Sequence, residues 1–143
     1  MKPSLPIVRR VLRAALYLII LLCAREAVAQ DDYNRLVRQG MDALTLDSLA
    51  QAEDCFREAM RREPTHPSNH LLFRYLGQIQ ERRGRGEEAL ESYTSGLNLS
   101  PQDLELRLDR AALYYRMGNE GHALSDYTDV LDQQPEHLEI GRA

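Results

Sequence analysis

The chain has 143 residues, a length that suits one domain, and its 43% hydrophobic and 28% charged residues are ordinary for a soluble globular protein. Acidic residues outnumber basic ones, giving a formal net charge of −4. This balance argues against a protein that holds nucleic acid on a broadly basic surface.

The first 29 residues have the three-part pattern of a secretory signal peptide. A basic start is followed by an apolar run of eleven residues, Ala14 to Ala24, and then by the small residues of Ala27-Val28-Ala29. The run is short for a membrane span, which needs about 20 apolar residues. We therefore expect cleavage before Gln30 and export to the periplasm or the outside of a bacterial cell. Two alternatives stay open: an uncleaved anchor, which would make the membrane a partner, and a lipid on Cys23, which the large Leu22 disfavours.

Cleavage would leave residues 30–143 with 13 arginines, no lysine and 21 acidic residues, a net charge of −8. That strengthens the argument against nucleic acid. Cys55 would be the single remaining cysteine, so no disulfide or Cys-based zinc site can form within one chain. Cys55 then has two interpretations: a small, partly exposed filler, or an intermolecular disulfide in an oxidising compartment.

From residue 33 to 137 a pattern recurs three times, with offsets of 37 and then 34 residues at every position. Small residues recur where two helices approach closely, an aromatic residue fills the space beside them, and a proline ends the second helix. The positions are Gly40, Gly77 and Ala111; Ala52, Ala89 and Ala123; Phe56, Tyr93 and Tyr127; Ala59, Gly96 and Val130; Pro64, Pro101 and Pro135. Each copy is therefore predicted to be a helical hairpin.

In chain order, the pattern predicts helices at about 32–46, 49–62, 68–83, 87–99, 103–117 and 120–133. Gly84 and Gly118 stand at the turn within a hairpin, where a left-handed conformation is useful, and Asp47 takes that place in the first copy. Candidate caps are Ser68 or Asn69 for the third helix and Ser100 or Asp103 for the fifth.

These copies resemble the tetratricopeptide repeat, a helix–turn–helix unit of 34 residues. The third copy shows it best, in the run from Arg110 to Gly118 followed by Ala123, Tyr127 and Pro135. The resemblance implies an all-α fold, in which three hairpins stack as a short right-handed α-solenoid after the signal peptide. The implied boundaries are a repeat region at 30–137, hairpins at about 33–66, 70–103 and 104–137, and a short tail at 138–143.

The third copy departs from the family pattern at one position of its first helix. The bulky apolar residue expected there is Leu36 in the first copy and Phe73 in the second, but Arg107 in the third. Leu104 and Leu108 are expected to substitute for it.

The resemblance also implies a concave groove, lined by the first helix of each hairpin, that binds a protein or peptide. A partner with apolar anchors and an acidic group or free C-terminus is expected, because arginines pair well with carboxylates. The alternative is that the groove arginines pair with Glu81 or Glu105 and form a solvated face. The chaperone-tail clamp of some relatives is not implied, since Val37 and Met41 stand where that clamp needs Lys and Asn. The implied groove residues are Asn34, Val37, Met41, Leu71, Arg74, Gln78, Arg82, Leu108, Tyr115 and Arg116.

The last hairpin presents Leu124, Thr128 and Leu131 outward, at positions i, i+4 and i+7 of one helix. The capping helix that usually closes such arrays is missing, and only Leu138 and Ile140 remain to cover this edge. The second functional hypothesis is therefore self-assembly, in which the edge stacks on another copy or on a larger repeat protein.

No motif in the sequence predicts catalysis, a cofactor or a metal site. His66 and His70 have a spacing that can bind zinc, but Pro67 between them breaks the helix, so exposed loop histidines are expected. The Gly84-Arg85-Gly86 segment follows a helix rather than a strand and is expected to be a turn. The sequence thus favours an exported, non-enzymatic scaffold that holds a partner segment in its groove.

Overall fold

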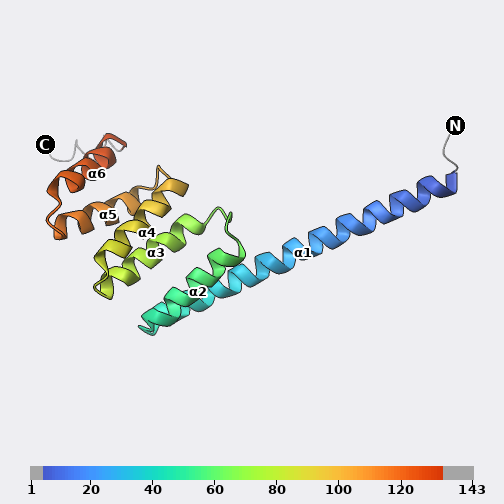
Figure 1. Cartoon of the computed structure of the whole chain (residues 1–143), viewed down its shortest axis with the longest axis horizontal. Helices are drawn as coiled ribbons and strands as arrows, with labels where there is room; N and C mark the ends of the chain where they lie inside the picture. Colours follow the sequence, from blue (N-terminus) through green and yellow to red (C-terminus); the bar gives the residue numbers. More distant parts are fainter. Residues whose placement is uncertain (1–4, 134–143) are drawn as a thin grey trace, which may run out of the picture.

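The computed structural model describes residues 5–133, with side chains at residues 8–28 and 30–133. In this part of the chain every regular element is an α-helix. Neighbouring helices pair as three hairpins, α1 with α2, α3 with α4 and α5 with α6, and the hairpins stack in chain order (Figure 1). The helices are α1 (Leu5–Thr45), α2 (Leu49–Arg62), α3 (Asn69–Arg82), α4 (Gly86–Leu99), α5 (Leu104–Arg116) and α6 (Glu120–Gln133).

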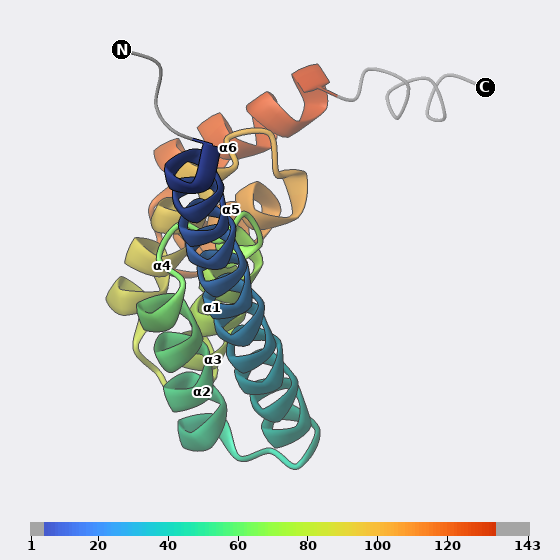
Figure 2. The same cartoon turned by 90° about the vertical axis from the view of Figure 1, so that its right-hand side faces the viewer.

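The predicted helices from α2 to α6 are confirmed to within one residue at each end. The predicted start of the first helix is wrong, because α1 begins at Leu5 and has 41 residues. Between Ile7 and Gln39 the sequence has no glycine or proline, so nothing interrupts helix propagation across the predicted cleavage point. The first half of α1 projects away from the hairpins (Figure 1), and Figure 2 views the molecule from the N-terminal end of this projecting part.

The apolar side chains of this projecting part are exposed, Leu12 at 63% and Leu18 at 60% among them. Even so, no helix within the described residues is both long enough and apolar enough to cross a membrane. The signal peptide remains a prediction.

Close packing inside each hairpin explains the repeating pattern of small and aromatic residues. A Cβ atom built on Gly40 would lie 2.5 Å from Cε1 of Phe56, and one on Gly77 would overlap the ring of Tyr93. Phe56 and Tyr93 are fully buried, as are the alanines that recur beside them. The predicted close approach of the two helices is thus confirmed in the first two hairpins.

The three turns within hairpins have the predicted left-handed residues. The φ angles are 57° at Asp47, 75° at Gly84 and 76° at Gly118. Asp103 caps α5 by accepting a hydrogen bond from the Leu106 N–H at 3.1 Å. Neither candidate caps α3 through its side chain; Asn69 is buried instead and accepts a hydrogen bond from the Tyr33 hydroxyl at 3.0 Å.

Arg107 itself fills the position at which the first two copies have a bulky apolar residue. Its Nη1 lies 2.5 Å from Oδ2 of Asp129 on α6, and its Nη2 donates to the carbonyl of Pro101 at 2.6 Å. Leu108 does not substitute for it, since that side chain is 36% exposed, whereas Leu104 is partly buried. An ion pair therefore joins α5 to α6 where an apolar contact was expected.

Candidate partner-binding groove

The predicted groove residues lie on α1, α3 and α5, the first helix of each hairpin. Four of their apolar side chains are substantially exposed: Met41 at 36%, Leu71 at 41%, Leu108 at 36% and Tyr115 at 64%. Val37 differs, because it is partly buried against the core of the first hairpin. The fold thus presents exposed apolar side chains on all three helices, available to a partner.

Arg74 is held by acidic residues of the next hairpin. Its Nε donates to Oδ2 of Asp109 at 2.6 Å, and its Nη2 donates to Oε2 of Glu105 at 2.8 Å. Gln78 donates to the same Asp109 oxygen at 2.9 Å. Burial alone would lower the pKa of Arg74, but the hydrogen bonds and charges of Asp109 and Glu105 raise it. Arg74 and Gln78 therefore stabilise the contact between α3 and α5.

The other two predicted arginines are also paired. Arg82 forms an ion pair with Asp47 of the first hairpin, and Arg116 forms one with Glu81 on α3. Glu81 in addition accepts a hydrogen bond from the Tyr93 hydroxyl. The predicted arginines are therefore ion-paired within the protein, as the alternative interpretation expected. Asp109 and Asp47 are partners that the sequence analysis missed.

Arg38 on α1 is an exposed arginine that the sequence analysis did not include among the groove residues. It is exposed, and it forms no ion pair with any residue that the structure describes. On α1 it stands one turn from both Asn34 and Met41, so the three side chains share one helix face. The repeat pattern could have indicated Arg38, because it has the same repeat position as Asp109 in the third hairpin. Asp109 contacts Arg74, one of the predicted groove residues.

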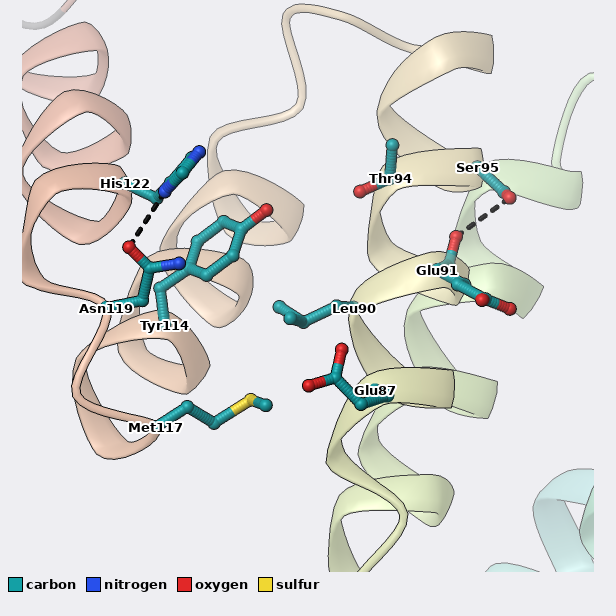
Figure 3. A pocket seen from close by; sticks show the side chains of 9 residues that line it. All are labelled: Glu87, Leu90, Glu91, Thr94, Ser95, Tyr114, Met117, Asn119 and His122. Atoms are coloured by element: carbon teal, nitrogen blue, oxygen red, sulfur yellow. Dashed lines mark hydrogen bonds between the residues drawn. The ribbon is translucent and has the colours of Figure 1, made fainter.

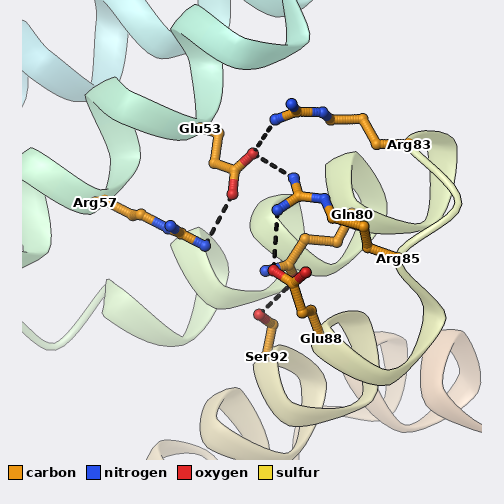
Figure 4. A network of polar contacts seen from close by, with 7 residues as sticks. All are labelled: Glu53, Arg57, Gln80, Arg83, Arg85, Glu88 and Ser92. Carbon is orange, nitrogen blue, oxygen red and sulfur yellow. Dashed lines mark hydrogen bonds and ion pairs between the residues drawn. The ribbon is translucent and has the colours of Figure 1, made fainter.

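A buried carboxylate fixes the first hairpin against the second (Figure 4). Glu53 on α2 is 4% exposed and is contacted by Arg57 at 2.8 Å, Arg83 at 2.5 Å and Arg85 at 2.5 Å. Burial alone would raise the pKa of Glu53, but hydrogen bonding and charge from Arg85, Arg57 and Arg83 lower it. The cluster therefore joins α2 of the first hairpin to the turn between α3 and α4 of the second.

A hollow of about 740 Å³ opens elsewhere on the molecule, between α4 and the hairpin of α5 and α6 (Figure 3). Tyr114 and His122 stack with ring centres 5.0 Å apart, and Asn119 contacts the His122 ring nitrogen at 2.8 Å. None of the predicted groove residues lines it. The hollow's lining is Glu87, Leu90, Glu91, Thr94, Ser95, Tyr114, Met117, Asn119 and His122.

The described residues contain no group of three or more side chains placed to hold a metal ion. His66 lies in the loop before α3, as expected, but it is partly buried because it stacks on Tyr33 with ring centres 3.9 Å apart. His70 lies in the first turn of α3 and is partly buried too, so the two histidines are not simply exposed loop residues. Cys55 is partly exposed, as predicted.

The predicted assembly edge lies on α6. Leu124 is 68% exposed and Leu131 is 44% exposed, while the Thr128 hydroxyl donates to the Leu124 carbonyl at 2.8 Å. Leu138 and Ile140, which were expected to cover this edge, lie outside the described residues, as does the tail.

Known proteins share this architecture. A tetratricopeptide repeat model matches residues 37–103. A solved tetratricopeptide repeat protein from Parabacteroides merdae is 38% identical, with a TM-score of 0.72, over 76% of this chain and 43% of its own. The chain thus spans less than half of that protein. A comparison with curated proteins gives no match.

Two further solved structures are similar in fold alone. The first tetratricopeptide repeat domain of Spaghetti (RPAP3), bound to the HSP90 peptide SRMEEVD, is 19% identical with a TM-score of 0.65, over 73% of this chain and 81% of that domain. PilF of Pseudomonas aeruginosa is 22% identical with a TM-score of 0.65, over 76% of this chain and 49% of its own.

Proposed function

Because this chain belongs to the tetratricopeptide repeat family, we propose that it is a binding scaffold whose groove holds a segment of a protein partner. The scaffold supplies no chemistry of its own. One observation carries the proposal: the first helices of the three hairpins expose apolar side chains, whereas Arg74, Arg82 and Arg116 are already paired with acidic residues of the protein.

The partner segment is expected to bind mainly through apolar anchors. Arg74 gives up two ion pairs if it takes a carboxylate from outside, and Arg116 gives up one. Replacing a protein carboxylate by a partner carboxylate gains little, because one charge-assisted contact is exchanged for another. Leu71 and Leu108, in contrast, lose only water when they are covered, which is favourable at about 25 cal/mol per Å² of apolar surface.

Arg38 would bind an acidic group of the partner at one defined place in the groove. Its guanidinium forms no ion pair with a described residue, so no such contact has to break when a partner carboxylate binds. Arg38 also lies beside the exposed Met41. A segment that places a carboxylate one turn from an apolar anchor fits this end of the groove. The peptide complex of the Spaghetti domain, similar to this chain in fold, supports a peptide segment as the kind of partner.

Site-specific photo-crosslinking tests the proposal on the protein in its native host. A crosslinking residue at Met41, Leu71 or Leu108 should capture the same partner segment, identified by mass spectrometry of the crosslinked peptide. The matched control is Leu99, which is 54% exposed but lies at the end of α4. Leu108→Glu should weaken binding of that segment at least tenfold and Leu99→Glu should not. Equal losses in both variants would contradict the groove as the site.

Export is part of the same proposal and has its own test. The basic, apolar and small-residue pattern of residues 1–29 supports removal before Gln30 and release into the periplasm or outside the cell. Mass spectrometry of the protein recovered from its host should find Gln30 as the first residue. A chain that retains residues 1–29 and sediments with membranes would instead support the uncleaved anchor.

A further inference from the structure

One exposed position on α6 corresponds to a position that is covered in the two preceding hairpins. Leu131 has the repeat position of Met60 and Leu97. Leu97 is 6% exposed because it packs in one cluster with Leu106 of α5, and Met60 packs against the core cluster that contains Leu72 and Leu76 of α3. Leu131, at 44%, has no following helix within the described residues. The Leu131 position is therefore one that a following helix covers elsewhere in this array.

The opposite end of the array cannot cover this face by head-to-tail stacking. In α3 and α5 the positions that meet the preceding hairpin include Leu72, Leu76 and Leu106, all buried. In α1 the equivalent positions are occupied by Arg35 and Gln39, both exposed. Stacking α1 of one copy on α6 of another would bury a guanidinium and an amide against leucines, which is costly.

The α6 face does match itself. Leu124 and Leu131 lie on either side of Thr128 along the helix, and the two acids between them, Asp126 and Asp129, pair with Arg110 and Arg107 of α5. If two α6 helices pack antiparallel, Leu124 of one copy meets Leu131 of the other, and the two Thr128 residues stand near the symmetry axis. Such an isologous contact closes on itself and gives a dimer rather than a filament.

We propose that this chain forms a two-fold dimer through antiparallel packing of α6 on α6 of a second copy. The dimer places the two grooves on opposite sides of one axis, so two partner segments bind to one assembly. The inference goes beyond the proposed function and does not rest on it, since the α6 face and the groove lie on different helices.

Disulfide trapping tests the dimer on the full-length chain in mild detergent, which shields residues 5–28 in every variant alike. In a Cys23→Ser/Cys55→Ser background, Thr128→Cys should form disulfide-linked dimers on oxidation, because residues at the axis of two packed helices come within reach of a disulfide. The matched control is His122→Cys, exposed on α6 but turned about 120° from Thr128 by the helical repeat. At least tenfold more dimer is expected for Thr128→Cys; similar yields would overturn the proposal.

Two substitutions then separate the two-fold dimer from other occupants of the face. Leu124→Glu and Leu131→Glu, both at exposed positions, should each reduce trapping at Thr128→Cys at least tenfold while circular dichroism shows unchanged helix content. Tagged wild type should also fail to retain untagged Leu131→Glu, because a two-fold contact needs Leu131 from both copies. Retention at wild-type strength would instead indicate head-to-tail stacking and overturn the two-fold dimer. A Thr128→Cys chain that stays monomeric would mean that another segment covers the face.

Discussion

Gly77 on α3 and Tyr93 on α4 occupy one space: a methyl group on Gly77 would overlap the buried tyrosine ring. The same relationship joins Gly40 to Phe56 in the first hairpin. The two helices of a hairpin thus approach each other as closely as the aromatic ring permits, which makes the glycine a packing requirement.

Gly77→Ala should therefore destabilise the protein although alanine favours helices. Overpacking costs about 1–3 kcal/mol, and the gain in helix propensity returns about 1 kcal/mol. We expect a clearly lower midpoint of thermal unfolding, followed by circular dichroism. Gly121→Ala on α6 is the control, because nothing lies within 4 Å of a Cβ built there. The packing argument is wrong if Gly77→Ala is as stable as Gly121→Ala.

Acid should unfold the protein partly through Glu53. The folded state lowers the pKa of this carboxyl below its ordinary value of 4.5, so its contribution to stability is complete above that value and is lost as the pH falls through the folded-state pKa. Glu53→Gln should lower stability at pH 7 by about 1–3 kcal/mol and make the loss between pH 5 and pH 3 less steep. Urea unfolding at each pH measures both effects, and Glu87→Gln, at an exposed position, should change neither.

Turn geometry predicts different outcomes for two equivalent residues. Gly84→Ala should cost about 1 kcal/mol, because φ at this position is 75° and a Cβ disfavours that conformation. Asp47→Gly, at the same turn of the first hairpin, should cost less. Its ion pair with Arg82 is exposed on both sides and is worth little, and glycine relieves the left-handed conformation. Unfolding midpoints that fall equally in both variants would contradict this account.

The ion pair between Arg110 and Asp126 should matter far more than the one between Arg74 and Glu105. Arg110 and Asp126 are joined by two hydrogen bonds of 2.8 and 2.7 Å, and their side chains are only 18% and 6% exposed. Asp126→Ala leaves a guanidinium nearly buried and should cost about 3–5 kcal/mol, whereas Glu105→Ala should cost less than about 1 kcal/mol. Amide hydrogen exchange should show the loss first in α5 and α6, because a stacked array opens from its ends. Loss of protection that begins in α2 would count against this.

Most of the fold could be predicted from the sequence because each hairpin needs the same few residues at the same places. One hairpin needs a small residue, an aromatic residue and a closing proline, such as Gly77, Tyr93 and Pro101. Equivalent positions recur in register and so identify three hairpins. The extension of α1 to Leu5 was missed because the signal-peptide pattern describes how a segment is processed and says nothing of its conformation.

The groove could be predicted less completely. Which helix face is exposed follows from the repeat register, and Leu71 and Tyr115 are indeed exposed. Which acid pairs with Arg74 depends on how far α5 is shifted along α3, a quantity set by packing between hairpins. Arg107 shows the same limit, since its partner Asp129 lies 22 residues away on another helix.

The unbroken course of α1 makes the apolar segment and the first hairpin parts of one rigid rod for as long as the chain is uncut. Each residue of an α-helix turns the next by about 100° and advances it by about 1.5 Å. Whatever holds residues 8–28 would therefore also determine the direction in which the groove faces. Deleting one residue between Ala24 and Gln30 would rotate the groove by more than a quarter of a turn about the helix axis. In an uncut chain, the length of this stretch therefore determines the orientation of the groove relative to residues 8–28.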